Sequence, residues 1–148
     1  MKRFTTQKQK TGEFGETCAQ QLLAKDGYVL VEKNFNCRFG EIDLIMQKDG
    51  RLHFIEVKTL VQKNILREGS GSYMSLSSRE LFIAQYRTLN NPFENISFHK
   101  KKKLMKTVEY YFFIHKKDMR NFSIDGIGII LNEYRDVVNY KVIHNIII

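Results

Sequence analysis

The chain has 148 residues and a mass of 17.5 kDa, enough for one domain that buries a core without disulfides. Its hydrophobic fraction of 43% and charged fraction of 27% exclude a chain that is disordered throughout. Lys and Arg number 24 against 16 Asp and Glu, which gives a net charge of +8. The charge suggests a polyanionic partner, either nucleic acid or an anionic membrane surface, although a merely solubilising surface is the alternative.

Three further features limit the function classes. No apolar stretch follows the charged N-terminus, which excludes a secretory signal, and no apolar run approaches the roughly 20 residues of a membrane span. Cys18 and Cys37 are isolated and are expected to be reduced thiols in a cytoplasmic protein. The histidines are scattered along the chain, so the sequence predicts no zinc-type cluster; they are His53, His99, His115 and His144.

The positive charge is confined to two segments. Residues 1–10 carry four basic side chains and no acid, and residues 97–120 carry eight basic and two acidic side chains. The rest of the chain has 12 basic and 14 acidic side chains and is slightly acidic. We therefore expect a basic N-terminal tail over 1–10 and a single domain over 11–148 that carries a basic helix.

In chain order, the first elements are a helix and three strands. Residues 11–26 place Phe14, Cys18 and Leu22 on one apolar stripe and predict a helix. Residues 28–33 predict a strand, followed by a turn around 34–36. Residues 41–47 and 51–58 alternate in hydrophobicity and flank Asp49–Gly50, a strong hairpin signal.

The second half of the chain is less regular at first. Glu68–Ser78 is rich in Gly and Ser and predicts a loop, after which Ser78 can cap a short helix through Tyr86. Ser97 is expected to cap a long helix that buries Leu104, Val108, Tyr111, Phe112 and His115. Residues 122–131 predict a strand, and the alternation of Val138, Tyr140 and Val142 predicts a last one. The order α-β-β-β-α-β-β indicates an α/β domain with a mixed sheet.

The hairpin carries the most informative pattern. A two-residue turn pairs Lys48 with Arg51, and the same register places Asp43 opposite Glu56 and Glu41 opposite Lys58. The other face is expected to be apolar, with Ile42, Leu44, Met46, Ile55 and Val57. Opposed carboxylates repel unless a cation lies between them, and Mg²⁺ is typically held by one or two carboxylates. An ordinary polar outer face with a surface Glu41–Lys58 ion pair is the alternative.

Two helices add candidates to this face. Glu16 lies three residues before Ala19 and seven before Leu23, so it is expected to look toward the sheet, although an exposed glutamate is the alternative. Lys100 and Lys101 flank the buried stripe of the long helix, and the remaining lysines are expected to form an outward basic ridge. The alternative is that all of these lysines are solvated.

These residues resemble the PD-(D/E)XK nuclease superfamily, and more closely the YraN family of predicted endonucleases, which are similar to Holliday-junction resolvases. The matching stretches include GEFGETCA at 12–19, GEIDLI at 40–45, HFIEVK at 53–58, PFENISFHK at 92–100 and the strand that reaches Asp125. The resemblance implies a restriction-endonuclease-like αβββαβ core, with a mixed central sheet flanked by helices. It also implies a divalent-metal-dependent endonuclease that acts on DNA, with branched or damaged DNA as candidate substrates.

The resemblance further implies a role for each residue. Asp43, Glu56 and the Val57 carbonyl would bind Mg²⁺ or Mn²⁺, Lys58 would orient the attacking water, and Glu16 would assist. Lys100, with Lys101 and Lys103, would contact the nucleic-acid backbone, and a second copy of the chain is a candidate partner.

The chain departs from the family pattern by Leu60 in place of an arginine, by Ser97–Phe98 in place of Thr-Pro, and by an insertion around 61–90. Two other functions stay open: a nucleic-acid-binding module that does not cut, and a protein–protein adaptor that uses the inserted segment.

Overall fold

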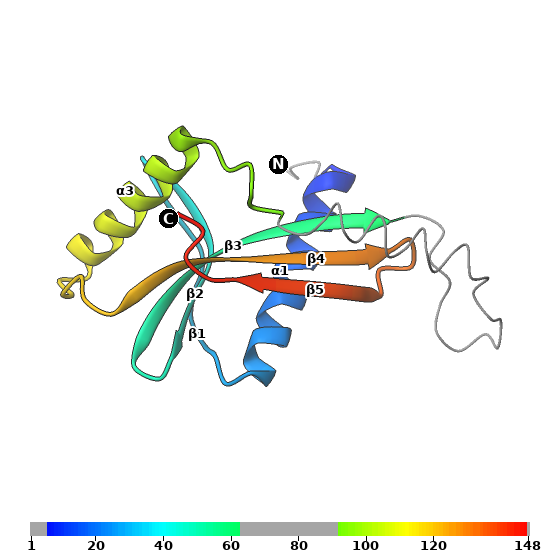
Figure 1. The fold of residues 1–148 in the computed structure, drawn as a ribbon, viewed down its shortest axis with the longest axis horizontal. Helices are drawn as coiled ribbons and strands as arrows, with labels where there is room; N and C mark the ends of the chain where they lie inside the picture. Colours follow the sequence, from blue (N-terminus) through cyan, green and yellow to red (C-terminus); the bar gives the residue numbers. More distant parts are fainter. Residues whose placement is uncertain (1–5, 63–91, 148) are drawn as a thin grey trace, which may run out of the picture.

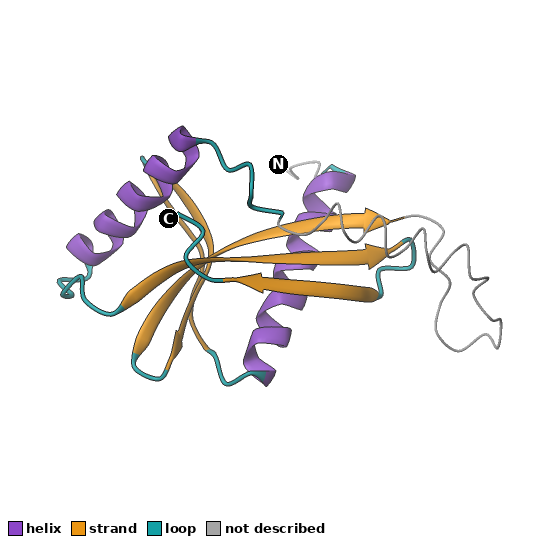
Figure 2. Cartoon of the chain, viewed as in Figure 1, coloured by secondary structure: helices purple, strands orange, loops and turns teal. Residues whose placement is uncertain are grey.

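The structure is a computed structural model that describes residues 6–62 and 92–147. Its elements are listed in chain order: α1 Gln7–Lys25, β1 Val29–Cys37, β2 Gly40–Lys48, β3 Arg51–Gln62, α3 Phe98–Ile114, β4 Phe122–Asn132 and β5 Val137–Ile143. The five strands form one mixed sheet, and the two helices lie on opposite sides of it (Figures 1 and 2). This is the α/β architecture that the sequence predicts, and it is consistent with a restriction-endonuclease-like core.

The sheet order is β1-β2-β3-β4-β5, in which only β3 and β4 run parallel. Parallel strands need a crossover connection, whereas the antiparallel pairs on either side are joined by short turns. Residues 123–132 of β4 are buried without interruption, which is typical of a strand covered on both faces. The expected strand at 122–131 is confirmed.

The pairing of β2 with β3 covers only the part of each strand that is nearest the turn. The predicted register is confirmed from Lys48↔Arg51 to Leu44↔Ile55, but the pairing stops there, one pair short of Asp43 and Glu56. Beyond that point β2 stays paired with β1, while β3 stays paired with β4 (Figure 1). We call the opening between residues 40–43 of β2 and residues 56–59 of β3 the fork.

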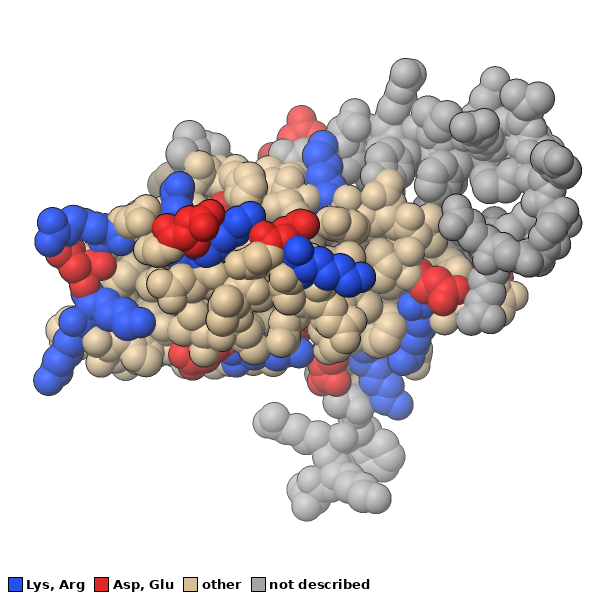
Figure 3. All heavy atoms as spheres, turned by 90° about the horizontal axis from the view of Figure 1, so that it is seen from below, with Lys and Arg blue, Asp and Glu red and all other residues tan. Residues whose placement is uncertain are grey.

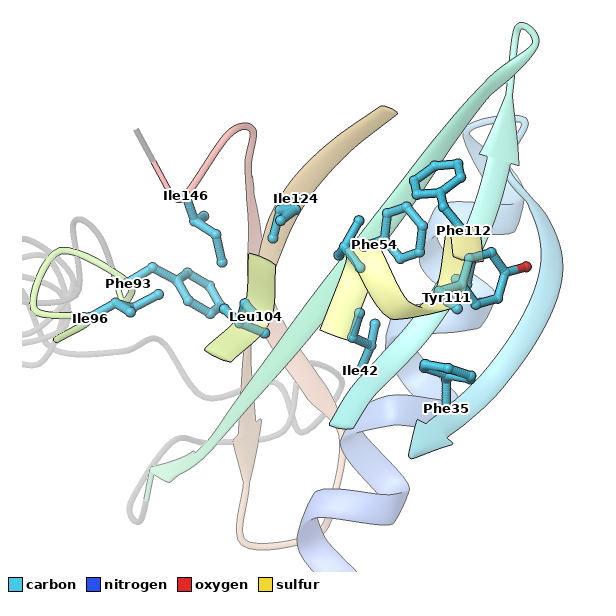
Figure 4. Close-up of a cluster of buried hydrophobic side chains, with 12 residues drawn as sticks. Phe35, Ile42, Phe54, Phe93, Ile96, Leu104, Tyr111, Phe112, Ile124 and Ile146 are labelled. Carbon is cyan, nitrogen blue, oxygen red and sulfur yellow. The ribbon is translucent and has the colours of Figure 1, made fainter. Parts of the chain in front are cut away.

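Two hydrophobic cores lie on opposite faces of the sheet. The core beneath α3 is rich in aromatic side chains, among them Phe54, Tyr111 and Phe112, whose rings meet edge to face (Figure 4). The core beneath α1 contains Ala19, Leu23 and aliphatic side chains from the strands. Because both faces are covered, the hairpin has no broad solvent-exposed side.

Several expectations need correction. Helix α1 begins at Gln7 rather than residue 11, because Thr6 and Gln9 form a capping box. Strand β1 continues past 34–36 to Cys37, and the turn falls at Arg38–Phe39.

On α3, the cap at Ser97 and the four expected apolar positions are confirmed, but His115 lies at the C-cap and is exposed. Ile42 packs in the core beneath α3, apart from Leu44 and Met46 in the core beneath α1, since regular β2–β3 pairing ends between these residues. The predicted loop and helix of the inserted segment lie outside the described residues.

None of the described helices is long and apolar enough to cross a membrane. Acidic and basic side chains are intermixed on the face shown in Figure 3, where the described residues form no broad area of one sign. The basic helix α3 lies on another side of the molecule (Figure 1).

Candidate metal and nucleic-acid site

Asp43 lies at the inner end of the fork. Its Oδ2 accepts a hydrogen bond from the backbone N–H of Val57, 2.6 Å away. Burial raises the pKa of Asp43 to about 7, the negative charge of Glu56 adds to this effect, and the Val57 hydrogen bond opposes it. Asp43 is therefore a half-buried carboxyl group whose ionised form an approaching cation would favour.

Glu56 faces the same opening from β3. Its carboxylate forms an ion pair with the Nζ of Lys100 from the first turn of α3, and its side chain is only 11% exposed. The Lys100 side chain is 45% exposed, so it can swing away into solvent at little cost. The sequence predicts only that Lys100 lies at the rim of the sheet, and the structure pairs it directly with Glu56.

Glu16 reaches the fork from the opposite side, on α1. Its Oε2 is buried and has no hydrogen-bond partner among the described residues. Burial raises the pKa of Glu16, and the charges of Glu13 and Glu41 contribute, while Lys33 and Asn34 lower it. An orphaned buried carboxylate oxygen is costly, and it indicates a place where a cation or a water is needed.

A close helix–strand contact positions Glu16. A Cβ added to Gly15 would lie 1.8 Å from Thr59 Oγ1, so only glycine lets α1 approach β3 at this point. The neighbouring residue on the helix is thereby held beside the fork. This explains physically why a glycine precedes the glutamate in GEFGE.

Lys58 follows Glu56 on the same face of β3. Its Nζ donates to the carbonyl oxygen of Pro92 at 2.6 Å and lies 4.9 Å from the centre of the Phe93 ring. Burial lowers the pKa of Lys58, as does the charge of Lys100, whereas Glu56 raises it. The lysine is therefore held by the segment that leads into α3, not by a surface ion pair with Glu41.

The Pro92–Phe93 segment lies against two glycines of β4. A Cβ at Gly126 would approach Phe93 to 2.4 Å, and a Cβ at Gly128 would approach Pro92 to 2.6 Å. These glycines are the register partners of Glu56 and Lys58 on β3. Bare backbone on β4 thus makes room for the segment that holds Lys58, a role that the sequence alone does not reveal.

The chemistry of the fork fits a divalent cation. Asp43 and Glu56 provide two carboxylates, Glu16 provides a third with an unpartnered oxygen, and oxygen ligands are what Mg²⁺ and Mn²⁺ prefer. The Coulomb repulsion that Asp43 experiences from Glu56 and Glu16 is relieved by bound positive charge. The charges of Glu56 and Glu16 act on Asp43, and Lys58 follows Glu56 on β3. The ligand atoms of the three carboxylates do not all lie within 4.8 Å of one another in the described part of the chain, so a cation would have to draw them together.

Next to the fork lies a hollow of about 250 Å³, lined by Gly40, Glu41 and Glu56 on one side and by Lys100 and Lys103 on the other. Lys103 also borders a second hollow of about 270 Å³, which we call the basic hollow; its lining residues are Arg38, Phe39, His99, Lys102, Lys103 and Lys106. Arg38 stacks over the Phe39 ring at 4.7 Å from its centre. The lysines of the expected outward ridge therefore face the β1–β2 turn.

The fold also assembles a polar group that the sequence pattern does not predict, which we call the polar cluster: His53, Ser123, Asp125 and His144. His53 Nδ1 lies 2.7 Å from Asp125 Oδ2, and His144 Nδ1 lies 3.4 Å from the same oxygen. Parallel pairing of β3 with β4 sets His53 beside Ser123, and this register cannot be deduced from local periodicity. The histidines that are scattered in sequence are thus partly gathered by the fold.

Comparison with known proteins gives a consistent relationship. The model of a family described as "Uncharacterised protein family UPF0102" matches residues 15–129. A UPF0102 protein of Clostridium botulinum (strain Kyoto / Type A2) is 35% identical over 137 residues, which cover 90% of each chain. A UPF0102 protein of Clostridium acetobutylicum is 30% identical over 136 residues, or 92% of each chain. The match includes every residue of the fork.

Proposed function

This chain belongs to the UPF0102 family, and from the fork that its fold assembles we propose that it is a divalent-metal-dependent endonuclease acting on DNA. The membership agrees with the YraN-family motifs in the sequence. Branched or damaged DNA is the proposed substrate class, because the motifs resemble those of nucleases that act on such DNA.

The observation that carries the proposal is the mutual repulsion of three carboxylates beside two lysines. The negative charges of Glu56 and Glu16 both raise the pKa of Asp43, Glu16 has an unpartnered buried oxygen, and a polyanion would be repelled by all three. A bound Mg²⁺ or Mn²⁺ reverses this repulsion, and it supplies Lewis-acid stabilisation of a phosphodiester and a more acidic water. A surface that only holds DNA has no need of such a group.

Each residue of the fork then has a defined role. Asp43 and Glu56 would hold the cation, with the carbonyl of Val57 as a further oxygen ligand, and Glu16 would orient a water beside it. Lys58 is anchored by Pro92 and directs its ammonium group at the attacking water or the phosphate. Its lowered pKa makes proton exchange near neutral pH easier than for an ordinary lysine.

Lys100 has two alternating partners in this proposal. Without the cation it neutralises Glu56, and with the cation bound it is free to contact a DNA phosphate together with Lys101 and Lys103. The exposed stem of Lys100 allows this exchange.

The test is cleavage of supercoiled, linear and four-way-junction DNA with Mg²⁺ or Mn²⁺. The wild type is expected to cut at least one substrate, and Asp43→Asn and Glu56→Gln should reduce the rate by at least about 100-fold. Glu109→Gln, on the exposed side of α3, is the matched control and should retain activity. Unchanged cleavage by Asp43→Asn, or full activity in EDTA, would contradict the proposal.

A nucleic-acid-binding module that does not cut is the second candidate, and one observation favours it. Lys100 already balances Glu56, and Lys58 is already bonded to Pro92, so the described residues leave Lys58 and Glu56 with partners in the absence of metal. This candidate predicts salt-sensitive DNA or RNA binding that survives Asp43→Asn without any metal-dependent cleavage by the wild type.

A further inference from the structure

The polar cluster brings together metal-binding side chains from three separate segments. His53 comes from β3, Asp125 from β4, and His144 from the turn that follows β5. One potential ligand atom of each lies within 4.8 Å of the other two. The three segments are far apart in sequence, and they meet here because β4 lies between β3 and β5 in the sheet.

The spacing of these atoms is close to that of a tetrahedral site. Metal–ligand bonds of about 2.0–2.1 Å imply separations of about 3.3 Å between neighbouring ligand atoms. The two nitrogen–oxygen distances to Asp125 Oδ2 are 2.7 Å for His53 and 3.4 Å for His144. The His144–Asp125 distance already matches this separation, whereas the shorter His53–Asp125 contact is a hydrogen bond that must lengthen for an ion to enter.

The three side chains differ in burial, and the difference suits an ion that has three protein ligands and one coordination position open to solvent. The side chains of Asp125 and His53 are only 2% and 10% exposed, whereas that of His144 is 59% exposed. Two ligands are thus fixed inside the protein, and the third closes the site from the surface. Solvent beside His144 provides both an entry path and a water for the fourth position.

Neighbouring groups hold the carboxylate in place. Ser123 Oγ donates to Asp125 Oδ2 at 2.9 Å, and the backbone N–H of Asn145 donates to Oδ1 at 3.0 Å. The carboxylate is therefore oriented by the kind of outer contacts that support metal sites.

We propose that His53, Asp125 and His144 form a binding site for a transition-metal ion of the zinc type. Two imidazoles and one carboxylate favour Zn²⁺, Co²⁺ or Ni²⁺ over Mg²⁺, which prefers oxygen ligands. The site is distinct from the fork, since it lies on the pair His53↔Ser123, three residues before Glu56 on β3. The bound ion ties the C-terminal segment, whose Ile146 enters the core beneath α3, to the two central strands.

The experiment is a titration of the metal-stripped full chain with Zn²⁺ by calorimetry and with Co²⁺ by visible absorption. It is carried out in the wild type and in Asp43→Asn, which removes a carboxylate of the fork. We expect one ion per chain that survives Asp43→Asn, at least about tenfold weaker binding in His144→Ala, and no change in His115→Ala, a histidine at the end of α3. Zn²⁺ should raise the melting temperature of the wild type but not of His144→Ala.

Equal Zn²⁺ affinity in the wild type and in His144→Ala would overturn the proposal, as would the absence of binding by the wild type. His144 is exposed, so its variant should fold, and circular dichroism in EDTA checks this. If that variant does not fold, NMR of the Co²⁺-loaded wild type decides. Paramagnetically shifted imidazole signals from two histidines support the site, and their absence contradicts it.

Discussion

The carboxylate of Asp43 accepts the backbone N–H of Val57 at 2.6 Å, where β2 and β3 stop pairing. A side-chain oxygen thus replaces a backbone carbonyl as the partner of a strand N–H, and the two strands are free to diverge. Burial and the charge of Glu56 raise the pKa of this carboxyl group to about 7, although the hydrogen bond itself lowers the pKa. One contact therefore opens the sheet and prepares a cation site.

This arrangement predicts a pH-dependent stability in EDTA. The pKa of Asp43 is about 7 in the folded chain and about 3.8 in the unfolded chain, so the folded state retains a proton that the unfolded state loses. Asp43 should therefore lower the free energy of unfolding progressively from about pH 4 to pH 7, by up to about 4 kcal/mol.

Denaturant unfolding of the wild type and Asp43→Asn over this pH range measures the effect. The difference between the two proteins isolates Asp43 from other titrating groups, and Asn can still accept the Val57 N–H. Saturating Mg²⁺ should remove the fall, because it stabilises the ionised form. A difference that does not vary between pH 4 and pH 8 would show that burial and the neighbouring carboxylates do not raise the pKa of Asp43.

Lys58→Met should separate cleavage from binding. Methionine preserves most of the apolar stem but removes the ammonium group that lies near Pro92 and Glu56. We expect the cleavage rate to fall by about 10²–10⁴-fold, the range for loss of a group that assists proton transfer, with DNA affinity nearly unchanged. Lys48→Met, on the same hairpin but over the Tyr28 ring, should cleave like the wild type. Wild-type cleavage by Lys58→Met would remove this lysine from the mechanism.

Two glycines of α1 should respond in opposite ways to alanine. At Gly15 a Cβ would lie 1.8 Å from Thr59 Oγ1, so Gly15→Ala should cost about 1–3 kcal/mol and displace Glu16 from the fork. At Gly12 a Cβ meets nothing within 4 Å, so Gly12→Ala should stabilise the helix by about 0.5–1 kcal/mol.

Thermal and urea unfolding compare the two variants. Thr59→Ala removes the closest clashing atom, so the double variant with Gly15→Ala should recover part of the loss. Equal stability of Gly12→Ala and Gly15→Ala would mean that the helix is not held tightly against β3.

Lysines of the basic hollow should determine the salt dependence of nucleic-acid binding. Each phosphate contact contributes about 0.9 to the slope of log affinity against log salt on duplex DNA. Replacing Lys102, Lys103 and Lys106 by Gln should therefore reduce the slope by up to about 3 and weaken binding to all sequences alike. Fluorescence anisotropy of labelled DNA at several salt concentrations measures this slope.

The control pair Lys25→Gln and Lys48→Gln, outside the hollow, should leave the slope unchanged. If the control pair reduces the slope as much as the hollow variants do, binding depends on the total charge of the chain and not on the basic hollow.

Local sequence was sufficient for most elements and for the hairpin. Asp49–Gly50 determines a two-residue turn, since both residues adopt positive φ, and the turn determines the register down to Leu44↔Ile55. The alternating pattern then places Asp43 and Glu56 near each other, and Ser97 marks the start of α3. The same alternation places Lys58 on the face of Glu56, and the helical spacing of Glu16 from Ala19 and Leu23 turns Glu16 toward the sheet. The family resemblance adds the roles that these residues are expected to have.

Only the tertiary structure decided which distant segments contact these residues. The end of the β2–β3 pairing, the Pro92 carbonyl on Lys58 and the gathering of His53, Asp125 and His144 all depend on the parallel β3–β4 register and on helix placement. Periodicity reports which side of its own strand a residue occupies, since that is a property of local backbone geometry. It does not report which distant segment packs there, because that is selected by the packing of the whole core.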